Sequence, residues 1–197
     1  IYSIMKSIYM LLFVWPMLAL QAQKWEKNYD YVDECICGLS KVSKNGMVGY
    51  ANKEGVEIIK LIYNDGLTFN EGLVAVKKDK KWLYLDSTGN EVTHAIFDEA
   101  MSFENGMAVV TKDGLSGYIN RSGKVVINFQ FQNAGNFREG LAPASNLKGY
   151  WGYIDKQANW VIKPQYGYAD NFSGEEARVI KDDKVFYINR ENKVLHE

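Results

Sequence analysis

The sequence predicts an all-β protein built from tandem repeats, and three observations lead to this expectation. Aromatic residues and glycines recur at a spacing of 34 or 35 residues, short β-branched runs alternate with polar turns, and no stretch keeps the 3.6-residue period of an amphipathic helix. A fixed period of this size is the signature of a repeat array. The recurring aromatic residues are Tyr50, Tyr84, Tyr118, Tyr153, Tyr187, Phe69, Phe103, Phe137 and Phe172.

The composition is typical of a soluble globular domain. Hydrophobic residues make up 47% of the 197 residues and charged residues 24%, which provides enough apolar side chains for a core and argues against a disordered chain. The formal net charge is −1, so the chain lacks the broad positive field that gathers phosphates. We therefore expect no nucleic-acid partner.

Residues 1–22 are predicted to be a secretory signal peptide. Lys6 precedes an apolar run at residues 8–20, and Ala22 supplies the small residue that suits a signal peptidase. A membrane anchor is the alternative, but a spanning helix needs about 20 apolar residues, and this run is shorter. We expect export to the periplasm or the extracellular space, without stable membrane insertion after cleavage.

Residues 23–197 are predicted to be one repeat domain. It begins with the second half of a unit at 25–37, continues through full units at 38–71, 72–105, 106–139 and 140–174, and ends with a partial unit at 175–197. The chain thus starts and stops within a unit.

Each unit is expected to form three short antiparallel strands, which in the second unit are 73–76, 82–85 and 92–93. The first two form a hairpin, because β-branched runs flank a polar turn such as Asp113-Gly114 of the third unit. Both faces of the strand at 82–85 are apolar, so neighbouring units must cover the sheet on both sides. The turn before each third strand opens with a residue that can hydrogen-bond its own backbone: Asn52, Asp86, Asn120, Asp155 and Asn189.

The fourth unit carries a recognisable motif. The segments Gly140-Leu141-Ala142, Trp151-Gly152-Tyr153-Ile154-Asp155 and Pro164-Gln165-Tyr166 resemble the WG repeat family, tandem bacterial modules named for their Trp-Gly pair. The similarity runs from residue 38 to the C-terminus. It implies an all-β repeat array, often exported, and assigns no activity to particular residues. In the other units the pair is degenerate, reading Val48-Gly49, Trp82-Leu83, Ser116-Gly117 and Val185-Phe186.

Two architectures fit about five units. In an open β-solenoid-like array, the terminal fragments are separate end caps. In a closed five-bladed propeller-like ring, they meet, and residues 29–37 pack beside residues 185–195. We expect the open form, because three strands per unit fall below the usual four-stranded propeller blade.

The two cysteines, Cys35 and Cys37, are separated by one residue. In an extended strand their thiols point to one face, where a disulfide is hard to close. We expect two small buried residues at the edge of the first unit, and their redox state stays open.

Three aromatic residues of the fourth unit break the repeat: Trp160, Tyr168 and Tyr150. Trp160 and Tyr168 stand where the second unit has Glu91 and Glu99, so we expect an exposed aromatic patch that binds a ligand or partner. Local packing is the alternative. The recurring tyrosines, in contrast, are interpreted as contacts between neighbouring units.

Nothing in the sequence indicates catalysis. His94 and His196 are the only imidazoles, and no motif surrounds a serine or cysteine, so we predict no enzyme, no cofactor and no metal site. The predicted function is an exported non-catalytic module that binds a protein or a cell-envelope glycan. The alternative is a carbohydrate-active or other hydrolytic enzyme, which needs two carboxylates facing each other across a cleft.

Overall fold

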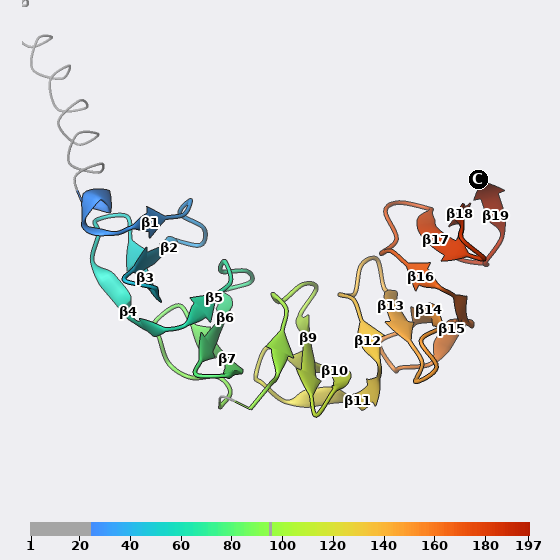
Figure 1. Ribbon diagram of the computed structural model, residues 1–197, viewed down its shortest axis with the longest axis horizontal. Helices are drawn as coiled ribbons and strands as arrows, with labels where there is room; N and C mark the ends of the chain where they lie inside the picture. Colours follow the sequence, from blue (N-terminus) through green and yellow to red (C-terminus); the bar gives the residue numbers. More distant parts are fainter. Residues whose placement is uncertain (1–24, 95) are drawn as a thin grey trace, which may run out of the picture.

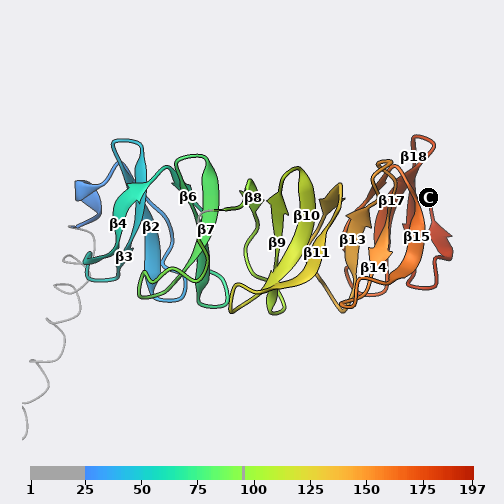
Figure 2. The ribbon, with the colours of Figure 1, turned by 90° about the horizontal axis from the view of Figure 1, so that it is seen from below.

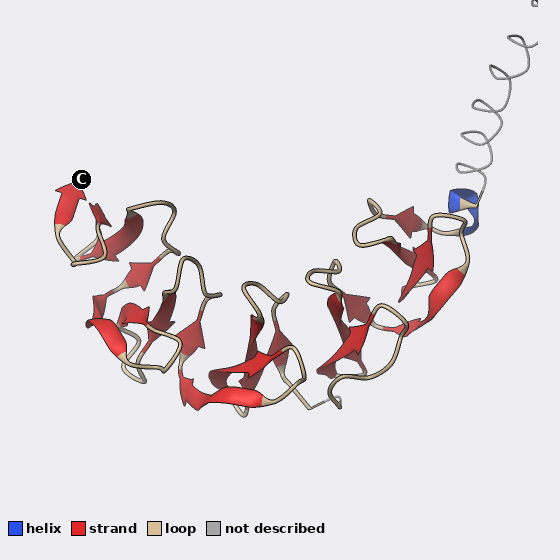
Figure 3. Cartoon of the chain, turned by 180° about the vertical axis from the view of Figure 1, so that it is seen from behind, coloured by secondary structure: helices blue, strands red, loops and turns tan. Residues whose placement is uncertain are grey.

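The computed structural model describes residues 25–94 and 96–197, and the predicted signal peptide lies outside them. The described residues form an arc of five small antiparallel sheets set side by side (Figure 1). A short 3₁₀ helix, η1 (Glu26–Asn28), lies at the N-terminal end of the arc (Figure 3). Within the described ranges, no helix is long and apolar enough to cross a membrane. The predicted all-β repeat array is confirmed.

The strands follow one another in chain order. The first sheet holds β1 (Tyr31–Val32), β2 (Leu39–Lys44), β3 (Met47–Asn52) and β4 (Glu57–Tyr63), and the second holds β5 (Asp65–Gly66), β6 (Leu73–Lys78) and β7 (Lys81–Asp86). The third holds β8 (Glu99–Ala100), β9 (Met107–Lys112), β10 (Leu115–Asn120) and β11 (Val125–Phe131). The fourth holds β12 (Asn133–Ala134), β13 (Ala142–Ser145), β14 (Trp151–Ile154) and β15 (Trp160–Tyr166), and the fifth holds β16 (Tyr168–Ala169), β17 (Ala177–Lys181), β18 (Lys184–Ile188) and β19 (Val194–His196).

Each sheet begins with a two-residue strand on the concave side of the arc, and the outer strands β4, β11 and β15 lie on the convex side (Figures 1 and 2). The three predicted strands are present in every sheet but the second, where the strand predicted at 92–93 is absent. The inner strand is an addition, because two residues are too short to show an alternating pattern. The inner strand belongs to the end of the preceding sequence unit. For example, β1, from the N-terminal half unit, pairs with β2 of the first full unit.

The glycine of the Trp-Gly pair is explained by a close backbone approach. A Cβ atom added to Gly49, Gly117 or Gly152 would lie 2.5, 2.7 or 2.3 Å from a carbonyl oxygen of the outer strand. The outer strand is irregular in register at each of these places. Only glycine lets this strand approach so closely.

The second sheet supports this explanation. Leu83 replaces the glycine and is fully buried. The following segment makes two isolated bridges to β7, Trp82 with Phe97 and Leu85 with Glu91, in place of a continuous outer strand. Trp82-Leu83, the degenerate pair with a large second side chain inside the array, therefore lies in the sheet that has three strands instead of four.

The recurring tyrosines join neighbouring sheets, as predicted. Each of the first four is buried and donates a hydrogen bond from its hydroxyl to a backbone carbonyl 17 residues later, in the inner segment of the next sheet. Each ring also packs on the recurring phenylalanine of that sheet, with centroids 4.8–5.2 Å apart. The bonds are Tyr50 to Leu67 at 2.6 Å, Tyr84 to Met101 at 2.6 Å, Tyr118 to Gly135 at 2.8 Å and Tyr153 to Asp170 at 2.7 Å.

The array is open, as predicted. Strand β1 pairs with β2, and the two ends of the arc lie far apart (Figure 1). The reason given from sequence does not hold, because most sheets do contain four strands. At the N-terminal end, Trp25 lies against Gly55 and donates a hydrogen bond to the Lys53 carbonyl at 3.2 Å.

The fifth sheet differs from the others on its outward face. Ala177 and Val179 pack toward the fourth sheet, so Glu176 and Arg178 point the other way, where earlier sheets carry mostly apolar residues. His196 lies 3.0 Å from the Glu176 carboxylate. A charged outward face opposes the packing of another sheet against it.

The structure corrects the expectation for the cysteines. Cys35 and Cys37 are free and exposed, in the loop between β1 and β2 of the first sheet. Cys37 has a positive φ of 53°, the conformation that Glu71 and Glu139 adopt at the equivalent turns. The turn places these side chains on the surface, so they do not contribute to the core.

Candidate functional site

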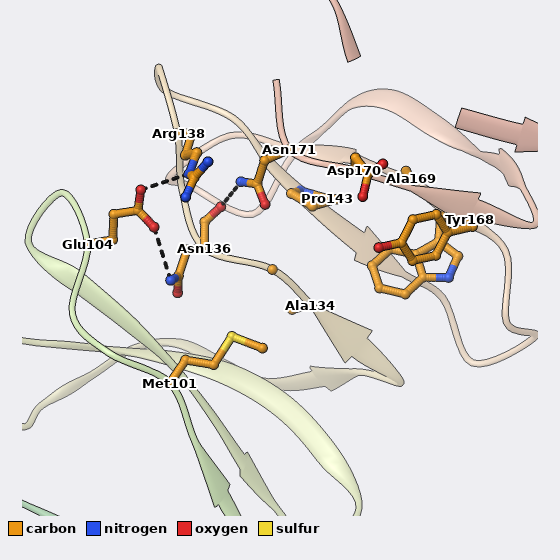
Figure 4. Close-up of a pocket in the computed structure, with 12 residues that line it drawn as sticks. Met101, Glu104, Ala134, Asn136, Arg138, Pro143, Tyr168, Ala169, Asp170 and Asn171 are labelled. Carbon is orange, nitrogen blue, oxygen red and sulfur yellow. Dashed lines mark hydrogen bonds and ion pairs between the residues drawn. The ribbon is translucent and has the colours of Figure 1, made fainter. Parts of the chain in front are cut away.

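A pocket of about 270 Å³ lies on the concave side, where the inner segments of the third, fourth and fifth sheets meet (Figure 4). We call it the concave pocket. One wall is aromatic and the opposite wall is polar, and small residues lie between them. Its lining consists of Met101, Glu104, Ala134, Gly135, Asn136, Arg138, Pro143, Trp151, Tyr168, Ala169, Asp170 and Asn171.

The aromatic wall is formed by Trp151 and Tyr168, whose ring centroids lie 5.6 Å apart with the planes tilted by 58°. Trp151 is the tryptophan of the Trp-Gly pair and opens β14, and Tyr168 opens the inner strand β16 of the next sheet. Trp151 is half-buried, and Tyr168 is 40% exposed. The Asp170 carboxylate accepts a hydrogen bond from the phenol, and this contact, together with partial burial, raises the pKa of Tyr168.

The polar wall is organised by Glu104. Its two carboxylate oxygens contact Arg138 Nε at 2.8 Å and Asn136 Nδ2 at 3.1 Å. Asn171 donates a hydrogen bond from Nδ2 to the Asn136 carbonyl (Figure 4). Glu104 and Arg138 hold the same repeat position in successive units, so their opposite charges meet across a junction between sheets.

Both carboxylates of the concave pocket are paired with arginine. Asp170 Oδ2 lies 3.2 Å from Arg178 Nη1, as Glu104 lies beside Arg138. Asn136 Oδ1 is the buried side-chain oxygen that finds no hydrogen-bond partner among the described residues. The wall therefore offers several donors and acceptors with little net charge.

The structure separates the three aromatic residues singled out from the sequence. Tyr168 lines the concave pocket. Tyr150 is 52% exposed, lies just before β14 and is not part of the lining. Trp160 begins the outer strand β15, where its ring packs edge-on against Phe131 at 5.7 Å. These residues do not form one patch.

Sequence reasoning missed most of the concave pocket. In the sequence, Trp151 belongs to the repeat motif, and the polar residues of the pocket carry no motif of their own. One signal was available: the repeat position after the recurring phenylalanine reads Asn70, Glu104, Arg138 and Ser173, which sets opposite charges next to each other at one junction.

Metal ligands do not gather anywhere in the described part of the chain. No group of three or more histidine, cysteine, aspartate or glutamate side chains is placed to hold a metal ion in residues 25–94 and 96–197. The concave pocket itself offers two carboxylates, two side-chain amides and one guanidinium from its lining. Such a set can bind and orient a polar ligand.

The solved structures that resemble the fold include the following two. The computationally designed protein Ika8 matches with a TM-score of 0.54 and 15% identity, over 83% of this chain and 60% of the designed one. Hsv2p of Kluyveromyces lactis matches with a TM-score of 0.53 and 13% identity, over 83% of this chain and 64% of that one. This chain thus spans about 60% of the length of the designed protein. At such low identity, these likenesses concern the fold alone.

Sequence comparison identifies the repeat. A search of curated proteins found no match to the chain. The family model described as WG containing repeat matches four consecutive segments, residues 49–82, 84–115, 117–150 and 151–184. These segments cover more than half of the sequence and keep the period of the tyrosine contacts. The chain belongs to the WG containing repeat family.

Proposed function

We propose that this protein is an exported, non-catalytic binding module whose concave side presents the concave pocket to a protein or a cell-envelope glycan. The observation that carries the proposal is the meeting of an aromatic pair, in which Tyr168 is exposed, and a hydrogen-bonded polar wall in one hollow. Binding sites commonly combine apolar surface with a few convergent polar groups.

The arginine pairing favours binding over hydrolysis. A glycoside hydrolase needs two carboxyl groups placed on either side of the scissile bond. In the concave pocket, the carboxylates of Glu104 and Asp170 are each engaged by an arginine side chain. Their oxygens accept hydrogen bonds from these arginines and are placed to accept others from a ligand.

Capture from cell-envelope material tests the proposal. The purified protein is immobilised and incubated with envelope proteins and glycans, and the retained molecules are compared among wild type, Tyr168→Ala and Tyr150→Ala. Both tyrosines are exposed, but only Tyr168 lines the concave pocket. We expect Tyr168→Ala to lose a retained molecule that Tyr150→Ala keeps. Identical retention by all three proteins would contradict the assignment.

The export part of the proposal has its own test. Removal of residues 1–22 is expected to leave the protein in the cytoplasm, and the exported form is expected to begin at Gln23. Mass spectrometry of the N-terminus after cell fractionation measures both. An exported protein that retains Lys6 would contradict cleavage.

A further inference from the structure

We infer that the concave pocket binds an uncharged sugar unit of a glycan, with one face of the sugar ring on Tyr168 and its hydroxyls on the polar wall. The inference rests on the proposed function and names the ligand class of the same site. Three properties of the lining support it: a held aromatic ring, a mixture of donors and acceptors, and charge neutrality.

The aromatic wall supplies a platform. Tyr168 is 40% exposed, and its ring is held 5.6 Å from Trp151, so one surface of the phenol is packed and another is open. The C–H groups on one face of a sugar ring carry partial positive charge, which suits the negative face of an aromatic ring. Because the ring is already held by Trp151, little side-chain entropy is lost when a ligand covers it.

The opposite wall matches hydroxyl groups. A hydroxyl both donates and accepts hydrogen bonds, so it is served best by neighbouring donors and acceptors. Arg138 and the amide of Asn171 supply donors, and the carboxylate of Glu104 supplies acceptors. Asp170, beside Tyr168, supplies a further acceptor on the aromatic side.

Charge distinguishes a sugar from a basic peptide. Glu104 is neutralised by Arg138, and Asp170 by Arg178, so a lysine or arginine side chain entering the concave pocket would have to break an ion pair and leave its arginine unpaired. A phosphate group would be repelled by the carboxylates of Glu104 and Asp170. An uncharged polar ligand can bond to both pairs and leave them intact.

Size sets the length of the recognised group. Ligand pockets commonly measure about 300–1,000 Å³. At about 270 Å³, the concave pocket suits one sugar ring rather than an oligosaccharide. Further units of a glycan would extend along the concave side of the arc.

Calorimetric titration of the purified protein tests the inference. The probes are three uncharged hexasaccharides, cellohexaose, chitohexaose and maltohexaose, each measured at low and at high salt. An arginine- and lysine-rich peptide is the rival probe. The proteins are wild type, Tyr168→Ala and the matched control Tyr150→Ala, which removes an exposed tyrosine outside the lining.

We expect at least one hexasaccharide to bind with an affinity that changes little with salt, because the ligand is uncharged. Tyr168→Ala should weaken this binding by about tenfold or more, and Tyr150→Ala should leave it unchanged. Asn136→Asp should also weaken it, because a third carboxylate would disturb the neutral wall.

Three results would overturn the inference. One is that no hexasaccharide binds, and another is that binding survives Tyr168→Ala. The third is that the basic peptide binds and the hexasaccharides do not, with an affinity that falls at high salt and is lost in Tyr168→Ala. This last result would leave the binding module of the proposed function standing with a different ligand, whereas equal envelope capture by all variants would remove the proposed function itself.

Discussion

Replacing Tyr118 with phenylalanine removes one hydroxyl from the junction between the third and fourth sheets. That hydroxyl donates a 2.8 Å hydrogen bond to the Gly135 carbonyl, and the side chain is fully buried. A hydrogen bond contributes about 1 kcal/mol net, and leaving the carbonyl without its partner adds to the cost. We expect the free energy of unfolding to fall by about 1–2 kcal/mol, which lowers Tm by about 2–8 °C in a chain of this size.

The matched control is Tyr187→Phe. Tyr187 holds the same position in the fifth sheet, no further sheet follows it among the described residues, and its ring stacks on His196 at 4.3 Å. Its hydroxyl therefore makes no hydrogen bond between two sheets, and we expect Tyr187→Phe to change the free energy of unfolding by no more than about 0.5 kcal/mol. Urea unfolding followed by tryptophan fluorescence measures both variants. Equal losses, or a Tyr118→Phe loss below about 0.3 kcal/mol, would refute the assignment of the tyrosine bond as a junction contact.

Three further predictions concern other parts of the array. Gly152→Ala should destabilise the protein by about 1–3 kcal/mol in thermal unfolding, because the added Cβ meets a backbone carbonyl at 2.3 Å, whereas Gly167→Ala, with 3.6 Å of room, should be tolerated. Hydrogen bonds, chiefly from the Thr88 side chain, lower the pKa of Asp86 to about 2 from its usual 3.8, so the turn is stabilised above about pH 4 and loses this stabilisation as the pH falls toward 2. Asp86→Asn should therefore flatten the dependence of Tm on pH between about 4 and 2, and a dependence equal to that of the wild type would contradict this role of Asp86. Trp160→Ala should lower the free energy of unfolding in urea by about 1–3 kcal/mol, because the half-buried ring packs against the core. Tyr168→Ala should lower it by about 0.5 kcal/mol or less, and a larger loss for Tyr168→Ala than for Trp160→Ala would place Tyr168 in the core.

The repeat itself was predictable from sequence because its residues act through neighbours at a constant distance. Tyr50 and its equivalents bond a carbonyl 17 residues later and pack on the recurring phenylalanine, so packing imposes the period that the sequence displays. The inner strands were not predictable in the same way. Two residues such as those of β5 form a strand only because β6 lies beside them.

The concave pocket was less predictable, because its residues come from three units. Tyr168 was identified as a break in the repeat, and its position in the pocket makes it the centre of the proposed site. Trp151 was hidden by its role in the repeat motif, and Glu104 gains its significance only from Arg138 in the next unit. Trp160 breaks the repeat as well, but its partner Phe131 was not visible from spacing alone. A residue that departs from a repeat can bind a ligand or fill a local gap, and sequence does not distinguish these roles.

The tyrosine bonds have a mechanical consequence. A force that pulls the two ends of the arc apart passes through the junctions in series, since each sheet contacts only its neighbours. Extension should therefore proceed in steps, each releasing a repeat of about 34 residues and lengthening the chain by about 110–120 Å. The second sheet, where Leu83 reduces the outer strand to two bridges, is expected to yield first.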